Sequence, residues 1–199
     1  GLVGSEMCIR DSVNDDWSFG SEWEGRMVSA VSYGPGEEAE FILNGTSLGR
    51  VPYERLTAKM DISYTPGILE AVSYREGKEI SRGSLVTAGE AVRILAEPEQ
   101  DTLKGDGQDI CYIRIMIADE NGVRLPAEER EIQAELTGPA VPAALGSGNP
   151  CTEDQIGQMS CHTFHGTAQL IIKVSEAGKI GIAVRSGGLQ TGYAAVHAV

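Results

Sequence analysis

Long apolar runs and positive charge are both scarce in this sequence. No apolar run approaches the ~20 residues that a helix needs to span a bilayer. Sixteen Lys and Arg face 29 Asp and Glu, which gives a formal net charge of −13. Nucleic acids and anionic membrane surfaces are bound through positive patches, so neither is expected as a partner. The acidity is explained by solubility alone.

Long segments with a helical period of 3.6 residues are also missing. The 199 residues include 25 glycines, and Pro-Gly and Asn-Gly pairs recur between short apolar stretches. Such punctuation is typical of strands joined by tight turns. The sequence therefore predicts an all-β chain, long enough for one or two domains of about 100 residues each.

The first residues do not read as natural protein. Leu2–Ser12 matches the translation of a transposon-end sequencing adapter, so residues 1–12 are interpreted as an artefactual leader and excluded from the fold. Without its two acidic residues and one basic residue, the net charge changes by one, from −13 to −12. We then expect Cys8 to have no biological role and the natural protein to extend upstream of Val13.

The strongest local signal is the stretch Phe41–Arg50. It contains Asn44-Gly45 between apolar residues, and a tight primed turn needs positive φ at both of its central residues. Phe41 and Leu43 alternate on one side of the first strand. The pattern predicts a half-buried β-hairpin.

Residues 13–87 are expected to form the first β-sandwich. Short alternating stretches are separated by Gly and Pro, as in such domains. The expected strands are Arg26–Tyr33, Glu40–Leu43, Ser47–Val51, Ala58–Tyr64, Ile68–Tyr74 and Ile80–Leu85.

Residues 88–199 are expected to form a second, immunoglobulin-like sandwich. Its clearest strand is Asp109–Asp119, and a Pro/Ala/Gly-rich stretch further on is expected to be a loop. The expected strands are Val92–Ala96, Asp109–Asp119, Ile132–Leu136, Thr167–Val174, Lys179–Val184 and Tyr193–Ala198. The predicted fold is therefore two tandem immunoglobulin-like β-sandwich domains.

An ordered succession of motifs over both domains resembles one family. Phe41–Arg50 is similar to an "LFLNGKSLG" hairpin, Tyr64–Tyr74 to "Y-x-P-G-x-L-x-A-V-x-Y", Ser84–Gly89 to "L-x-T-A-G", and Leu103–Ile113 to "L-x-A-D-G-x-D-L-x-Y-V". These segments resemble the β-sandwich domains that follow the catalytic barrel in bacterial family 2 glycoside hydrolases of the β-galactosidase type. Lys104-Gly105 departs from the family pattern, which more often has Ala before Asp-Gly.

The resemblance implies a parent enzyme that hydrolyses O-glycosidic bonds with retention, using two glutamates on a TIM barrel. Neither catalytic motif occurs here, and a barrel of about 250 residues does not fit in the chain. No residue is assigned a catalytic role, and no cofactor is expected. The expected partners are the barrel and the preceding sandwich domains of the same chain.

Two clusters have the residue types of metal sites. Cys161-His162-x-x-His165, with Cys151 nearby, contains zinc ligands at a spacing that fits no common zinc pattern. Asp106 and its acidic neighbours could supply oxygens to Ca²⁺, but they are also typical of turns in which Asp binds backbone N–H groups. We expect no metal at either place.

Three cysteines remain once Cys8 is set aside. Cys111 lies in an apolar strand and is expected to be buried. The spacing allows a Cys151–Cys161 disulfide, but an odd number leaves at least one thiol unpaired. This favours a reducing compartment, and hence the cytoplasm.

Trp17 and Trp23 are the candidate binding residues. Both precede the first strand, where they could pack on a preceding domain or stack against a sugar ring. Interdomain packing fits a structural role for the chain. Stacking fits the first alternative, a carbohydrate-binding module. A second alternative is a surface adhesin built of immunoglobulin-like repeats.

Overall fold

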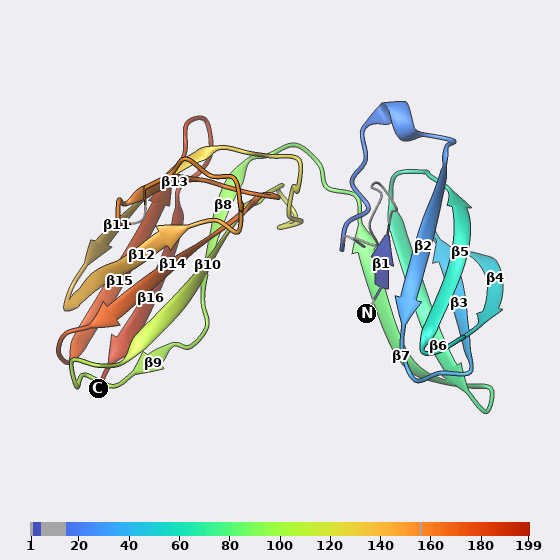
Figure 1. Cartoon of the computed structure of the whole chain (residues 1–199), viewed down its shortest axis with the longest axis horizontal. Coiled ribbons are helices and arrows are strands. Elements are labelled where there is room, and N and C mark those ends of the chain that lie inside the picture. Colours follow the sequence, from blue (N-terminus) through green and yellow to red (C-terminus); the bar gives the residue numbers. More distant parts are fainter. Residues whose placement is uncertain (1, 5–14, 156) are drawn as a thin grey trace. The chain divides into compact units, whose positions relative to one another are not determined.

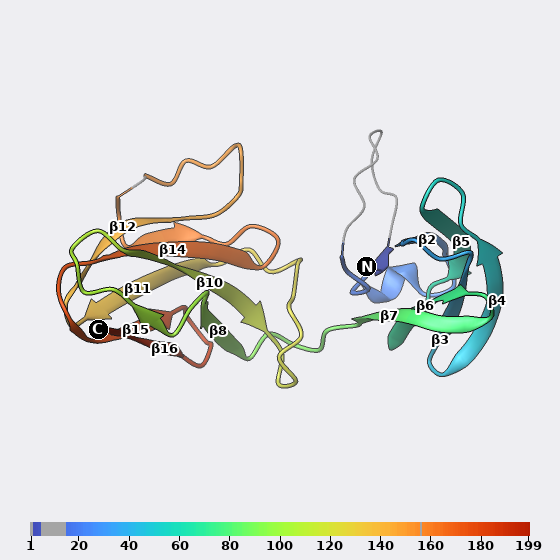
Figure 2. The same ribbon diagram turned by 90° about the horizontal axis from the view of Figure 1, so that it is seen from below.

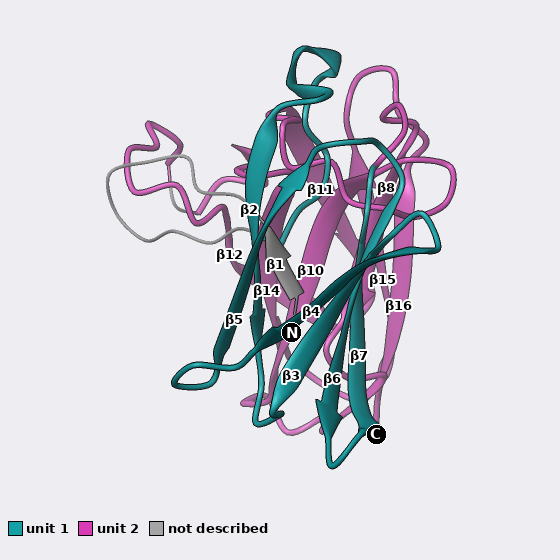
Figure 3. Ribbon diagram, turned by 90° about the vertical axis from the view of Figure 1, so that its right-hand side faces the viewer, with its two compact units in different colours: residues 1–87 teal, residues 88–199 magenta. Residues whose placement is uncertain are grey.

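The computed structural model describes residues 2–4, 15–155 and 157–199. The described chain consists of strands and one 3₁₀ turn, η1 (Ser21–Trp23), and it divides into two compact units, 1–87 and 88–199 (Figures 1 and 3). The prediction of an all-β chain made of β-sandwich domains is confirmed. No described helix is long and apolar enough to cross a membrane.

Unit 1 contains two sheets. One has the strand order β1-β2-β5 and the other the order β4-β3-β6-β7. The strands are β1 (Leu2–Gly4), β2 (Met27–Tyr33), β3 (Glu38–Leu43), β4 (Thr46–Pro52), β5 (Thr57–Ser63), β6 (Ile68–Arg75) and β7 (Lys78–Val86). Strand β1 belongs to the adapter-like leader and pairs antiparallel with Ala30–Ser32 of β2. Residues 5–12 of that leader lie outside the described residues.

The core of unit 1 lies between its two sheets. Val28 and Ile62 come from one sheet, and Phe41 and Leu69 from the other. These side chains are buried because alternate residues of a strand point to the same face. Unit 1 is thus a sandwich of antiparallel sheets with its own core.

The Asn-Gly hairpin forms as the sequence predicts. Asn44 and Gly45 have φ values of 50° and 79°, and Leu43 pairs directly with Thr46 across the turn. Glu76 and Gly77, with φ values of 51° and 71°, make an equivalent turn between β6 and β7. Both turns match the right-handed twist of the strands that they join.

Two strands of unit 1 contain a β-bulge. In β4, Phe41 pairs with Gly49 but Ile42 pairs with Ser47, so Leu48 is an extra residue. In β7, Ser73 pairs with Ser81 but Tyr74 pairs with Glu79, so Ile80 is extra. Each bulge changes which residues of the strand face the core.

Unit 2 also contains two sheets, with strand orders β12-β14-β10-β8 and β13-β11-β15-β16-β9. The strands are β8 (Arg93–Pro98), β9 (Thr102–Leu103), β10 (Ile110–Ala118), β11 (Glu131–Thr137), β12 (Ala140–Gly146), β13 (Ser160–His162), β14 (Thr167–Val174), β15 (Gly178–Arg185) and β16 (Gly192–Ala198). The prediction of a loop after β11 was wrong at Ala140–Gly146, because β12 forms there and pairs with the edge of β14. The short strands β9 and β13 were not expected either.

The core of unit 2 is rich in β-branched and other aliphatic side chains. Ile113 and Ile115 of β10 and Leu170 and Ile172 of β14 are fully buried on one sheet. Ile180 of β15 covers them from the other sheet. Each such side chain contributes about 1.5–3 kcal/mol when it is removed from water.

A buried carboxylate holds the first segment of unit 2 in place. Asp119 is 2% exposed and accepts hydrogen bonds from the backbone N–H groups of Gly89, Asn121 and Val123. Burial opposes its ionisation, but these donors outweigh that effect and the pKa of Asp119 is lowered. The carboxylate thereby ties the segment before β8 to the turn after β10.

The turn before β5 contains two strained residues. Arg55 and Leu56 have φ values of 50° and 68°, a left-handed conformation that costs a non-glycine residue about 1–2 kcal/mol. Leu56 is 63% exposed, so it gains little from burial. We therefore predict that Leu56→Gly stabilises unit 1 by about 1 kcal/mol, or about 5 °C in melting temperature.

Both tryptophans of the chain lie in unit 1, so tryptophan fluorescence during urea unfolding reports on this unit alone. The matched control is Leu48→Gly, at an exposed leucine whose φ is not positive; it should lower stability. Equal effects of the two substitutions would contradict the strain argument.

Candidate functional site

Trp17 belongs to an aromatic cluster in unit 1. Its ring centroid is 5.1 Å from that of Tyr64 and 5.8 Å from that of Phe19, both in edge-to-face geometry. The indole Nε1 of Trp17 donates to the backbone carbonyl of Thr65 at 3.1 Å. The Thr87 hydroxyl donates to the backbone carbonyl of Trp17 at 2.7 Å. Trp17 thus ties together the segments before β2, before β6 and after β7.

The structure gives Trp17 a core role in place of the expected interdomain or sugar contact. Its side chain is completely buried within unit 1, so no ring face is open to a sugar or to another domain. The Tyr64 ring packs against the indole, and Tyr64 is 47 residues away in the sequence, so no local pattern around Trp17 predicts this burial.

Trp23 occupies a more open position. It lies in η1, is partly buried against the core, and has its ring 5.5 Å from that of Phe19. The guanidinium of Arg26 lies 5.4 Å from the Trp23 ring centroid, in a cation–π contact. Trp23 therefore keeps some surface for a contact outside the unit.

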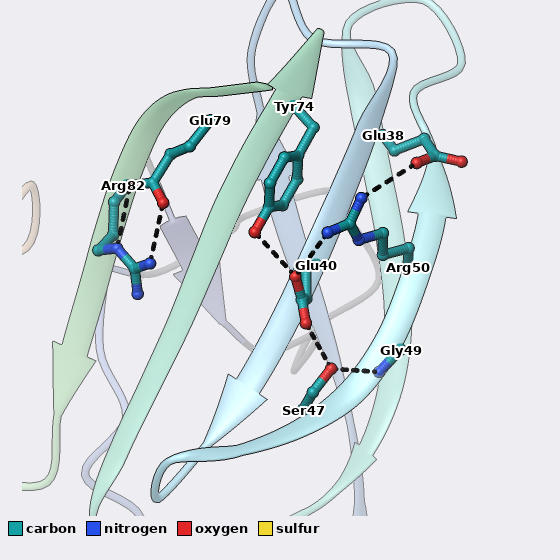
Figure 4. A network of polar contacts seen from close by, with 8 residues as sticks. All are labelled: Glu38, Glu40, Ser47, Gly49, Arg50, Tyr74, Glu79 and Arg82. Atoms are coloured by element: carbon teal, nitrogen blue, oxygen red, sulfur yellow. Dashed lines mark hydrogen bonds and ion pairs between the residues drawn. The ribbon is translucent and has the colours of Figure 1, made fainter. Parts of the chain in front are cut away.

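A polar network covers the outer face of the β4-β3-β6-β7 sheet (Figure 4). Glu40 is at its centre. The Ser47 hydroxyl donates to Glu40 Oε1 at 2.6 Å, the Tyr74 hydroxyl to Oε2 at 2.9 Å, and Arg50 Nη2 to Oε2 at 3.3 Å. The guanidinium of Arg50 also lies 3.8 Å from the centroid of the Tyr74 ring.

A second part of the network is centred on Arg82 of β7. Its guanidinium contacts Glu70 at 2.8 Å and Glu79 at 3.0 Å. Between the two parts lies Val72, which pairs with Glu40 on one side and with Arg82 on the other. Val72 is completely buried although it points away from the core, so the long side chains of the network shield it from water.

The two bulges make this network possible. Ser47 and Arg50 are three residues apart and would face opposite sides of a regular strand. The extra residue Leu48 brings both onto the face that contains Glu40 (Figure 4). The extra residue in β7 does the same for Glu79 and Arg82.

The electrostatics of the network keep its groups in their ordinary charge states. Hydrogen bonds from Ser47 and Tyr74 lower the pKa of Glu40, which favours the carboxylate. The hydrogen bond to Glu40 raises the pKa of Tyr74, which favours the neutral phenol. These hydrogen bonds and ion pairs link β3, β4, β6 and β7 on the outer face of the sheet.

The side chains around Cys161 that have the types of zinc ligands do not converge. Cys161 is buried, and burial raises the pKa of its thiol to about 11. Cys151 is exposed and both thiols are free, so the disulfide that the spacing allowed is absent. His162 instead pairs with Asp154, whose Oδ1 lies 2.9 Å from the His162 Nδ1.

The Asp-rich loop before β10 is a hydrogen-bonded turn. Asp106 Oδ1 accepts from the backbone N–H of Gln108 at 2.9 Å and of Asp109 at 3.0 Å, which lowers the pKa of Asp106. Asp109 in turn accepts from the N–H of Lys104. Among the described residues, no group of three or more His, Cys, Asp or Glu is placed to hold a metal ion.

Cys111 is fully buried in β10, as expected for a small apolar side chain, and burial raises the pKa of its thiol.

Among the described residues, the four carboxyls with a displaced pKa share a common direction. The pKa is lowered for Glu40, Asp106, Asp119 and Asp154. In each case hydrogen-bond donors within the same unit hold the carboxylate, which therefore supports a turn or a sheet. These features define a pair of β-sandwich units whose displaced carboxylates have structural roles.

Comparisons with known proteins place these units in a family. A family model described as glycoside hydrolase family 2 C-terminal domain 5 matches residues 94–194. A second model, a domain of unknown function (DUF4982), matches residues 25–81. The first match covers half of the chain, so the chain belongs to glycoside hydrolase family 2, as part of its C-terminal region.

Individual relatives agree with this family. A β-galactosidase of Bacteroides ovatus is 25% identical over 161 residues, which are 79% of this chain and 19% of the relative. A solved family 2 member of Bacteroides cellulosilyticus is 26% identical, with a TM-score of 0.88 over 98% of this chain and 28% of that one. A solved β-glycosidase of Bacteroides vulgatus, 23% identical over 92% of this chain and 24% of that one, has the same fold with a TM-score of 0.87. The chain thus spans less than a third of the length of each.

The burial of Trp17 predicts a large difference between the two tryptophans. Replacing a buried Trp by Ala leaves a cavity and costs about 3–5 kcal/mol, so Trp17→Ala should destabilise unit 1 by that amount. Trp23→Ala should cost about 1 kcal/mol, because Trp23 is only partly buried. In each variant the remaining tryptophan reports the urea transition. Similar losses in the two variants would refute the core role of Trp17.

The His162–Asp154 pair predicts a local pH dependence. The hydrogen bond with Asp154 raises the pKa of His162 above its ordinary 6.5, and the donors of His162 lower the pKa of Asp154. The ion pair is complete only between these two values, so its contribution is lost as pH rises through the pKa of folded His162 or falls through that of Asp154. In Asp154→Asn, the NMR titration of the His162 ring should move to lower pH. An unchanged titration of His162 in this variant would show that Asp154 does not stabilise the charged imidazole.

Proposed function

We propose that the chain is a non-catalytic C-terminal part of a retaining glycoside hydrolase, in which it supports a catalytic TIM barrel. The observation that carries the proposal is the match of half of the chain to a C-terminal domain model of the family. A retaining glycosidase needs one carboxyl with a raised pKa and a second at about 5–5.5 Å from it. The carboxylates described above serve sheets and turns instead.

The parent enzyme is proposed to act on β-galactosides. The Bacteroides ovatus relative is a β-galactosidase by name, whereas another relative, from Formosa agariphila, is called a putative β-glucuronidase and is 25% identical over 138 residues, 67% of this chain and 13% of that protein. β-Glucuronides are therefore the competing substrate class. The partners in this proposal are the barrel and the preceding sandwich domains of the same chain, and Trp23 is the residue proposed to contact them.

The first test is whether the chain alone hydrolyses a glycoside. The 199-residue chain is assayed with p-nitrophenyl β-galactoside and p-nitrophenyl β-glucuronide. We expect no turnover of either substrate. Activity that copurifies with the chain through several columns would overturn the non-catalytic assignment.

The supporting role is tested by a graft. In the family 2 member of Bacteroides cellulosilyticus, the region that matches this chain is deleted or replaced by residues 13–199. We expect the deletion to lower the melting temperature and the soluble yield of the barrel, and the graft to recover part of both. The matched control is the same graft with Ile113→Asp, which puts a charge into the core of unit 2 and should recover less. A deletion without effect would show that the region does not support the barrel.

The source DNA provides a third test. Sequencing upstream of Val13, with the adapter trimmed away, should extend the reading frame into a barrel of about 250 residues that contains two catalytic glutamates. A frame that continues into further sandwich repeats would favour the adhesin alternative.

A further inference from the structure

Unit 2 has a cleft on the outer face of its β12-β14-β10-β8 sheet. A cavity of about 610 Å³ lies between this face and residues 147–154, which follow β12 and arch away from the sheet (Figure 2). A hollow of about 390 Å³ lies beside it and contains Tyr112. Arg114 and Gln169 line both. We call the two together the unit 2 cleft.

The charged groups of the cavity are already paired. Arg114 Nη2 lies 3.0 Å from Oε2 of Glu97, in the adjacent strand. Asp154 accepts from the backbone N–H of His162 at 2.8 Å and pairs with the His162 ring. Glu99 adds a negative charge at the hollow. An anionic ligand would therefore meet no unpaired cation here, and the chain as a whole has a net charge of −13.

Uncharged hydrogen-bonding side chains remain for a ligand. Ser147 and Gln169 make no side-chain hydrogen bond within the described residues. The side-chain oxygen Oδ1 of Asn149 accepts a hydrogen bond from the backbone N–H of Cys151, which leaves the side-chain NH₂ group of Asn149 available. Such groups have hydrogen-bond donors and acceptors at defined positions. Each can form a hydrogen bond with a neutral hydroxyl without the cost of burying a charge.

The apolar surface of the cleft lies next to these groups. Tyr112 is 37% exposed, and its ring presents an apolar body with a polar tip at the hollow. Ile171 of β14, which pairs with Tyr112, contributes to the wall of the cavity. The volume is within the range of about 300–1,000 Å³ for small-molecule sites, which combine apolar walls with a few polar groups.

We propose that the unit 2 cleft binds a neutral oligosaccharide. A sugar ring has an apolar C–H face and a rim of hydroxyls, and the cleft offers a partner for each. Tyr112 lies against a ring face, and Gln169, Arg114 and Asn149 bind hydroxyls. This site is additional to the supporting role and independent of it.

The test is a titration of the ¹⁵N-labelled 199-residue chain, followed by NMR. The probes are cellotetraose, xylotetraose, mannotetraose and β-1,4-galactotetraose, with tetragalacturonic acid as the anionic comparison. We expect a neutral tetrasaccharide to shift the backbone amides of Tyr112, Arg114 and Gln169 in a saturable way, with a Kd of about 1 mM or lower. Tetragalacturonic acid should bind more weakly.

Variants then locate the site. Tyr112→Ala and Gln169→Ala should each weaken binding by about tenfold, or about 1.4 kcal/mol. The matched control is Tyr193→Ala, which removes a more exposed tyrosine from the other sheet of unit 2 and should leave binding unchanged. Thermal unfolding followed by circular dichroism checks that each variant is folded.

Three results would overturn the proposal. The first is the absence of saturable shifts with every neutral tetrasaccharide at about 10 mM, tenfold above the expected Kd. The second is an equal loss of binding in Tyr193→Ala and Tyr112→Ala. The third is binding of tetragalacturonic acid as tight as that of the best neutral probe. None of these bears on the graft, so the two proposals fail independently.

Discussion

The burial of one face of each sheet against a second sheet is the interaction on which both units depend. A strand offers every second side chain to the core, and here those positions hold residues such as Phe41 and Leu69 in unit 1 and Ile113 and Ile172 in unit 2. Without the facing sheet, each of these side chains would be exposed to water, and its contribution of about 1.5–3 kcal/mol to stability would be lost. The turns, the buried Asp119 and the polar network all act on sheets that this packing already holds.

Most of the strands could be predicted because their signals are local. β14 alternates buried and more open residues over its length, β10 is rich in isoleucine, and Asn44-Gly45 fixes its own turn through positive φ values. β12 could not be predicted, since Pro142 and several alanines read as a loop. It forms because β14 offers a free edge, and Pro142 is tolerated at the bulge of an edge strand.

The candidate sites were harder to predict because they depend on contacts between residues that are far apart in sequence or shifted by a bulge. Trp17 packs against Tyr64, which is far away in sequence, so its position before β2 says nothing about its exposure. Ser47 and Arg50 meet Glu40 only because of the extra residue between them. The unit 2 cleft depends on the path of residues 147–154 beside the sheet. No pattern in the sequence predicts that path.

The bulges have one more consequence, which concerns association between chains. β4, β7 and β12 are edge strands, and an edge strand leaves backbone N–H and C=O groups open to a strand from another molecule. Each of the three contains an extra residue: Leu48, Ile80 and Ala143. A flat partner strand cannot keep its register across such a bulge, so these edges resist the edge-to-edge pairing that leads to aggregation. The same irregularities that organise the outer face of unit 1 therefore also help to keep exposed sheets from joining one another.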